Sequence, residues 1–100
     1  MVITSGYAKD LPAGDMKAVK AGDREILLVH TGTGIYALDN RCIHGGCSLV
    51  NGSLEGENLR CPCHGSVFRV KTGDVVNGPA TTAQPVYNLI IGNGEMSLNL

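Results

Sequence analysis

The sequence has no tryptophan, and phenylalanine and tyrosine together make up only four of its 100 residues. Large aromatic side chains normally supply much of the area that a core buries, and a chain this short is marginally stable without extra support. Long apolar runs are also missing, because the longest compact ones, residues 26–29 and 89–91, are far below the roughly 20 residues of a membrane-spanning helix. We therefore expect no membrane span and an additional source of stability.

A secretion signal and a basic surface are absent from the sequence as well. The first 30 residues lack the basic-then-apolar order of a signal peptide, and the eight basic and nine acidic residues form no clustered basic face. We therefore expect a soluble cytoplasmic protein without a nucleic-acid partner. One hundred residues suffice for one core, and no linker or repeat divides them, so residues 1–100 are predicted to form a single domain.

Short β-prone runs alternate with glycine-centred turns along most of the chain, a pattern typical of an all-β sandwich or barrel. No segment carries the apolar spacing of an amphipathic helix, so almost no α-helix is expected. Strands are predicted at residues 2–7, 16–20, 25–30, 34–39, 58–60, 67–70, 86–91 and 95–100. Residues 54–59 predict a tight turn between two short strands.

The informative part of the sequence is its cysteines and histidines. All four cysteines and two of the three histidines gather in one stretch: Cys42, His44, Cys47, Cys61, Cys63 and His64. In a secreted protein this density would suggest two disulfides, whereas in a cytoplasmic protein it favours a metal site. Two disulfides would also leave both of these histidines without a role.

The spacings Cys42-x-His44 and Cys61-x-x-His64 place one thiolate and one imidazole in each of two glycine-rich segments. Alternate side chains of an extended loop point the same way, so Cys42 and His44 can face one centre. Thiolate and imidazole together suit zinc or an iron–sulfur cluster, and not magnesium or calcium. A zinc site would use the same four residues, although zinc fingers normally pair cysteine with cysteine and histidine with histidine.

The segments C-I-H-G-G-C at 42–47 and C-P-C-H-G-S at 61–66 resemble the two boxes of the Rieske [2Fe–2S] proteins. The rest of the chain is similar in length and strand order to a small Rieske-type ferredoxin. This resemblance implies one [2Fe–2S] cluster, with Cys42 and Cys61 on one iron and His44 and His64 on the other. It also implies three stacked antiparallel sheets, with the cluster-binding loops, about 41–48 and 61–68, at one end.

The same resemblance assigns roles to residues around the ligands. It implies a disulfide between Cys47 and Cys63 that ties the two loops together, with two buried free thiols as the alternative. In the family, a serine at the position of Ser66 donates its hydroxyl to a bridging sulfide, and a tyrosine two residues later donates to a cysteine sulfur. Here that later residue is Phe68, which has no donor. Pro79 stands where the family has a proline-containing loop over the cluster.

Replacing two thiolates of a [2Fe–2S] cluster by neutral imidazoles removes two negative charges, so the oxidised cluster accepts an electron more easily. Potentials then rise to about −150 to +300 mV, from about −400 mV for plant-type ferredoxins. The resemblance therefore implies a monomeric one-electron carrier between a reductase and a terminal oxidoreductase such as an oxygenase. It would not be an enzyme itself, because no catalytic constellation accompanies the cluster motif. The alternatives are a small Rieske subunit of a larger oxidoreductase, such as a nitrite reductase, and a zinc-binding interaction module.

Overall fold

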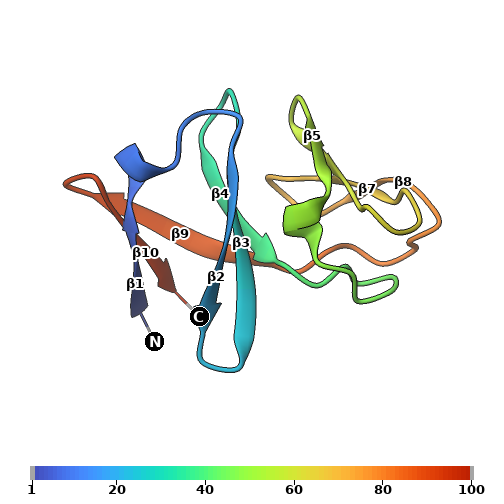
Figure 1. Cartoon of the computed structure of the whole chain (residues 1–100), viewed down its shortest axis with the longest axis horizontal. Helices are drawn as coiled ribbons and strands as arrows, with labels where there is room; N and C mark the ends of the chain where they lie inside the picture. Colours follow the sequence, from blue (N-terminus) through green and yellow to red (C-terminus); the bar gives the residue numbers. More distant parts are fainter. Residues whose placement is uncertain (1, 100) are drawn as a thin grey trace.

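The computed structural model describes residues 2–99, and within them nearly all of the regular secondary structure is antiparallel strand (Figure 1). The strands are β1 (Val2–Tyr7), β2 (Met16–Ala21), β3 (Arg24–His30), β4 (Ile35–Asp39), β5 (Ser53–Glu55), β6 (Asn58–Arg60), β7 (Val67–Arg69), β8 (Val75–Asn77), β9 (Val86–Gly92) and β10 (Glu95–Asn99). The 3₁₀ turns η1 (Ala8–Asp10) and η2 (Leu49–Asn51) are the only helical segments in this range, and neither is long or apolar enough to cross a membrane. The predicted all-β class is confirmed.

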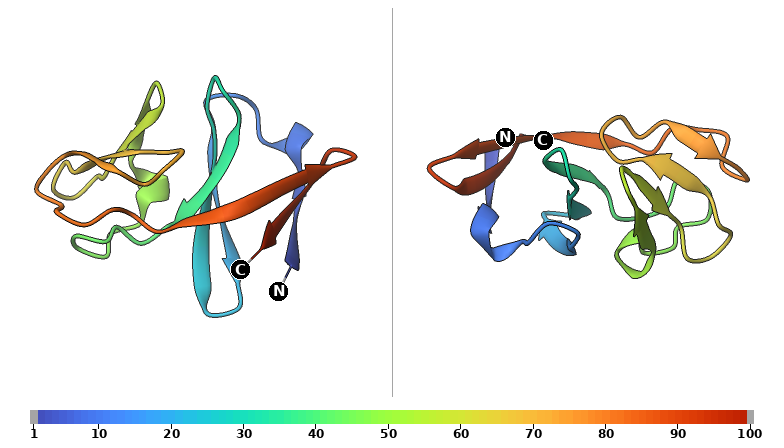
Figure 2. Two further views of the ribbon diagram at one scale, coloured as in Figure 1. Left: turned by 180° about the vertical axis from the view of Figure 1, so that it is seen from behind. Right: turned by 90° about the horizontal axis from the view of Figure 1, so that it is seen from above.

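The described strands form three antiparallel groups, as the family resemblance implied. Strands β1, β10 and β9 form the first, β9, β4, β3 and β2 the second, and β5, β6, β7 and β8 the third. The first two groups share β9, which pairs with β10 along most of its length and with β4 where Tyr87 faces Ala37 and Val86 faces Leu38. Together they make one six-stranded sheet, in the order β1-β10-β9-β4-β3-β2, beside the four-stranded sheet β5-β6-β7-β8. Because β9 runs across the molecule and borders both neighbours (Figure 2), it joins two groups of strands into one sheet.

Strand β3 lies at the centre of the core, and residues 26–29 expose none of their surface. Since consecutive side chains of a strand point to opposite faces, Leu27 and Val29 enter one core cluster while Ile26 and Leu28 enter a second. The apolar run in the sequence is therefore a strand buried on both faces. The cluster that contains Leu27 extends to the cysteine-rich segments at one end of the molecule, next to the four-stranded sheet (Figure 1).

The predicted and observed strands differ mainly where strands are short. The sequence predicts no strand at 75–77, where β8 forms, because three residues beyond a glycine turn carry no periodic pattern. The expected tight turn at 54–59 is present, with Gly56 at a φ of +64° between β5 and β6. The predicted strand 95–100 is observed as β10, and its last residue, Leu100, lies outside the described residues.

Candidate metal centre

The first cysteine-rich segment, loop 1 (residues 41–48), follows β4 and forms a closed turn. The Cys42 N–H donates to the Cys47 carbonyl at 2.8 Å, and the Gly46 N–H donates back to the Cys42 carbonyl at 2.7 Å. Gly46 has a φ of +77°, a left-handed conformation that glycine adopts without strain. An isolated β-bridge between Arg41 and Ser48 closes the base of loop 1.

The second segment, loop 2 (residues 61–66), connects β6 to β7 and repeats this geometry. The Cys61 N–H donates to the Ser66 carbonyl at 2.8 Å, and the Gly65 N–H donates to the Cys61 carbonyl at 3.3 Å. Gly65 has a φ of +78° at the position equivalent to the left-handed glycine of loop 1. The predicted loop 61–68 is two residues too long, because Val67 and Phe68 already belong to β7.

A disulfide joins Cys47 of loop 1 to Cys63 of loop 2, with a Cα–Cα distance of 6.4 Å. The pairing implied by the resemblance is thus present, and the alternative of two free thiols is not. The two residues are 16 positions apart in the sequence. The disulfide holds the loops side by side and supplies the additional stability that the small, aromatic-poor chain requires.

The two histidines of the motif meet at the surface. The ring centroids of His44 and His64 are 5.2 Å apart, in an edge-to-face arrangement with an interplanar angle of 89°. Both residues are exposed. The loops approach closely here, so that a β-carbon built at Gly45 would lie 3.5 Å from the His64 ring. Two imidazoles from different loops are therefore brought to one exposed place.

The other two cysteines, Cys42 and Cys61, are each 3% exposed and neither is in a disulfide. Burial raises the pKa of the Cys42 thiol. The backbone amides of His44 and Gly45 act to lower this thiol pKa, whereas the neighbouring Cys61 thiol acts to raise it. The two thiols, one from each loop, are thus adjacent in the core.

The four candidate ligands therefore form two pairs, one of buried thiols and one of exposed imidazoles. Among residues 2–99, no three His, Cys, Asp or Glu side chains are grouped so that they could hold one metal ion. A structural zinc site gathers four ligands about a single ion, whereas Rieske ligation places both histidines on one of two irons. The paired donor set fits a binuclear cluster better than a zinc ion.

The residues expected around the ligands also lie at this end. The Ser66 hydroxyl oxygen accepts a hydrogen bond from the Ala80 N–H at 3.0 Å, and both residues are buried. Since this bond uses an oxygen lone pair, the hydroxyl hydrogen remains available to another acceptor. The exposed Pro79 precedes Ala80, so its segment is tied to loop 2. Phe68 exposes no surface and belongs to the same core cluster as Cys42.

Sequence reasoning missed two buried polar residues that contact loop 1 or its ends. Gln84 is 2% exposed, although it stands in a stretch with the composition of a surface loop, and its carboxamide bonds the backbone of loop 1. Asn40 is fully buried at the end of β4, where its side-chain oxygen accepts from the Val50 N–H at 2.9 Å. No local pattern indicates that either residue is buried, because their side-chain partners lie 10 to 45 positions away.

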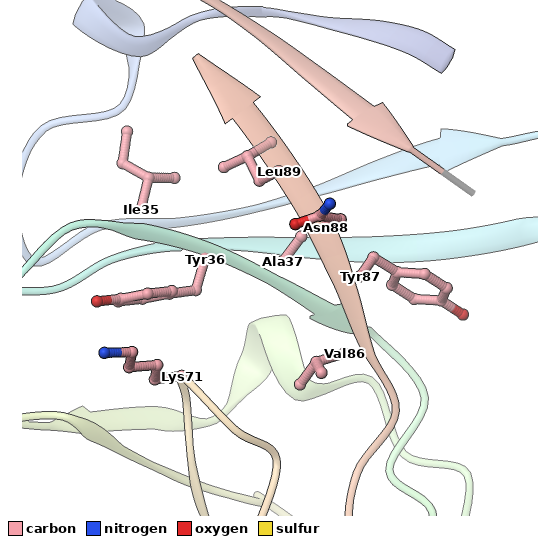
Figure 3. A pocket seen from close by; sticks show the side chains of 8 residues that line it. All are labelled: Ile35, Tyr36, Ala37, Lys71, Val86, Tyr87, Asn88 and Leu89. Carbon is pink, nitrogen blue, oxygen red and sulfur yellow. The ribbon is translucent and has the colours of Figure 1, made fainter. Parts of the chain in front are cut away.

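A groove of about 480 Å³ lies beside β4 and β9 and is separate from this centre (Figure 3). Its walls include Tyr36 and Val86, and the Lys71 side chain lies near the Tyr36 ring. None of the four candidate ligands lines it. The groove therefore contributes nothing to the candidate metal centre.

The comparisons with known sequences agree with the motif. A family model described as the Rieske [2Fe–2S] domain matches residues 2–88. The chain is 37% identical over 98 residues to a Ralstonia sp. protein named the ferredoxin component of naphthalene 1,2-dioxygenase/salicylate 5-hydroxylase systems, with 98% of this chain and 94% of that one covered. It is also 40% identical over 92 residues, 92% of this chain, to apoptosis-inducing factor 3 of Mus musculus, of which the match covers only 15%.

A solved structure extends the agreement to the fold. A chain in the complex of reduced oxygenase and oxidized ferredoxin in carbazole 1,9a-dioxygenase superposes with a TM-score of 0.92 at 30% identity, and the match covers 97% of this chain and 91% of that one. The stacked antiparallel arrangement with both loops at one end is therefore shared with a solved protein over almost its whole length.

Proposed function

Because the chain belongs to the Rieske [2Fe–2S] domain family, whose cofactor is a [2Fe–2S] cluster, we propose that Cys42 and Cys61 hold one iron of that cluster and His44 and His64 the other. The observation that carries this proposal is the pairing of the four side chains, one of each kind from each loop. The thiols pair inside the core and the imidazoles pair at the surface. The histidine side is then the exposed side of the cluster.

We propose that the protein is a one-electron carrier between a reductase and a terminal oxygenase. When bound, the cluster supplies a site that takes up and releases one electron. The chain contributes the exposed edges of His44 and His64, at which a partner protein can approach the cluster closely. The Ralstonia relative, covered over 94% of its length, supports this role because it is named as a ferredoxin component.

The first experiment determines the metal content and the ligands. The purified protein should contain about two irons and two sulfides per chain and show a reduced-state EPR signal of low average g. His64→Ala should lose the cluster, whereas His30→Ala should keep it, because the His30 ring is bonded to the Leu11 carbonyl at 2.6 Å, far along the chain from the loops. A colourless protein with stoichiometric zinc would refute the proposal in favour of the zinc-binding module.

The second experiment tests electron transfer itself. The reduced protein, mixed with the oxygenase of a naphthalene dioxygenase system under anaerobic conditions, should be reoxidised in a single one-electron phase observed by stopped-flow absorption. The reductase of the same system should reduce it again. A protein with an intact cluster that exchanges electrons with neither partner would contradict the carrier role while leaving the cluster assignment in place.

A second candidate function is a Rieske domain or subunit of a larger oxidoreductase. The match to a small part of apoptosis-inducing factor 3 favours it, because there the same kind of domain belongs to a much longer chain. A single-domain carrier should sediment as a monomer and be recovered alone from the cytoplasmic fraction. Stable co-purification with one large partner at constant stoichiometry would support the subunit role.

A further inference from the structure

The side chain of Gln84 uses both ends of its carboxamide on the backbone around loop 1. Its Oε1 accepts from the Ile43 N–H at 2.8 Å, and its Nε2 donates to the Asp39 carbonyl at 2.8 Å and to the Arg41 carbonyl at 2.6 Å. Gln84 is 2% exposed, so water cannot replace these bonds at low cost. One side chain therefore holds the backbone at residues 39, 41 and 43, on both sides of the candidate ligand Cys42.

The backbone of Gln84 is itself held from outside both loops. Its N–H donates to the Gly73 carbonyl at 2.8 Å, and the next residue, Pro85, accepts from the Asp39 N–H at 2.9 Å. The approach at Gly73 is so close that a β-carbon there would lie 2.0 Å from the Gln84 carbonyl oxygen. The carboxamide is therefore presented from a rigid support, and a single atom added at Gly73 would displace it.

The bond to Ile43 has a consequence for the two residues that follow it. The Ile43 N–H points to Gln84, while the backbone amides of His44 and Gly45 lie close enough to the Cys42 sulfur to lower its thiol pKa. Planar peptides leave only two free dihedral angles per residue, so holding residue 43 restricts the directions of the next amides. Hydrogen bonds to the sulfurs are among the factors that set the potential of an iron–sulfur cluster.

Loop 2 has no N–H that needs a partner at the position equivalent to Ile43. The residue after its first cysteine is Pro62, which has no N–H to satisfy and has a fixed φ. Loop 1 has Ile43 at this position, and its N–H would be left without a partner if Gln84 did not accept it. The two loops share one backbone turn, but only loop 1 depends on a distant side chain at this position.

We propose that Gln84 is a positioning residue for the cluster: it holds residues 41–45 so that two backbone amides face the Cys42 sulfur, and it thereby raises the reduction potential. This inference rests on the proposed function, because the amides affect a potential only if Cys42 holds iron. The outer partners of metal ligands orient them and tune the metal in this way in other sites.

The test compares wild type with Gln84→Met, which keeps the length of the side chain and removes its hydrogen bonds. The matched control is Leu98→Val, a fully buried change in the other core cluster, away from both loops. Iron and sulfide are measured first in wild type, and their absence there would refute the proposed function and not the role of Gln84. Potentials are then measured by voltammetry in one buffer, with spectra confirming intact clusters.

We expect Gln84→Met to have a lower potential than wild type with an unchanged number of irons, and Leu98→Val to keep the wild-type potential although it melts earlier. Adding Ile43→Pro to Gln84→Met removes the orphaned N–H, as in loop 2, and should bring the potential back towards wild type. An unchanged potential in Gln84→Met, an equal shift in Leu98→Val, or no recovery in the double variant would each overturn the proposal.

If Gln84→Met does not assemble a cluster, hydrogen exchange of the wild-type protein tests whether Gln84 holds the Ile43 N–H. Ile43 is 44% exposed, yet its N–H is bonded to a buried acceptor. The amide of residue 43 should therefore exchange far more slowly than in an unfolded peptide. Exchange at the unfolded rate in the intact wild-type protein would overturn the proposal.

Discussion

Loops 1 and 2 have almost the same backbone and very different surroundings. Both close through a cysteine N–H bonded to the carbonyl five residues later, and both have a left-handed glycine four residues after that cysteine. Loop 1 is held from behind by the buried side chains of two polar residues outside it. Loop 2 instead has Pro62, its own buried Ser66 bonded to the Ala80 N–H, and an exposed ion pair between Arg60 and Glu55. The sequence thus encodes the same backbone turn in both loops, while different residues outside the turn hold each loop in place.

The support behind loop 1 includes Asn40 as well as Gln84. The Asn40 carbonyl accepts from the Leu49 N–H at 2.7 Å, its N–H donates to the Glu25 carbonyl at 2.9 Å, and its amide nitrogen donates to the Glu25 carboxylate. Loop 2 has a looser brace, in which the Arg60 guanidinium donates to the Gly65 carbonyl at 3.3 Å.

The largest effect should come from the buried thiols, and it should be the same in both loops. Cys42→Ser and Cys61→Ser should each reduce the iron content from about two per chain to none and loosen both loops, because cluster binding is coupled to folding. Iron analysis and visible absorption measure this. Retention of a normal cluster by one of the two variants would show that the loops do not contribute equivalent ligands.

Removing the link between the loops should cost less than removing a ligand. The double variant Cys47→Ala/Cys63→Ala should still assemble the cluster, but its free energy of unfolding should fall by about 3 kcal/mol, the value expected for a closed loop of about 15 residues. Guanidinium denaturation and the rate of cluster bleaching on heating are the measurements. Native alkylation of both wild-type thiols would contradict the disulfide.

Removing one side-chain amide behind loop 1, that of Asn40, should lower the stability of the protein. Asn40→Ala removes the acceptor of the Val50 N–H and the donor to Glu25, so the free energy of unfolding should fall by roughly 2–3 kcal/mol. Arg60→Ala, the matched change beside loop 2, should have a much smaller effect because the ion pair is exposed. Equal losses in chemical denaturation would remove the proposed difference between the loops.

A smaller effect is expected on the potential from Ser66 in loop 2. A hydrogen bond to a cluster sulfur stabilises the reduced state more than the oxidised state. Since one neutral hydrogen bond contributes roughly 0.5–1.5 kcal/mol, Ser66→Ala should lower a one-electron potential by about 20–65 mV. Phe68→Tyr should shift it the other way if the new hydroxyl reaches the sulfur. Voltammetry that gives Ser66→Ala a potential at or above wild type would withdraw this role.

The smallest effect should be the pH dependence of the brace beside loop 2. The Arg60 guanidinium donates to the Glu55 carboxylate at 2.9 Å and holds the pKa of that carboxyl below its usual range. A lowered pKa means that the contribution is complete above the usual glutamate value, about 4.3, and is lost as the pH falls through the lowered one. Glu55→Gln should therefore melt slightly earlier than wild type at pH 7 and equally with it in strong acid. A difference that grows on acidification would contradict the pairing.

The candidate ligands were predictable from the sequence because their chemistry and spacing are local. Cys42 and His44 stand two positions apart, Cys61 and His64 three, and the glycine at the fourth position after each first cysteine allows the left-handed turn that closes the loop. The all-β class followed in the same way from turns and short apolar runs. Only the tertiary structure shows how the groups of strands join, because whether β9 borders one neighbour or two depends on how far it extends across the molecule.

The candidate ligands and the turn of each loop can be predicted from the sequence alone, since both depend on residues within six positions of one another. The pairing of the thiols in the core, the pairing of the imidazoles at the surface and the approach of Gln84 to loop 1 from 41 positions away arise from the packing of distant segments. The physical reason is that a buried polar group needs a partner wherever the fold places it, and a polar residue in a loop-like stretch gives no sign of burial until the strands around it are packed.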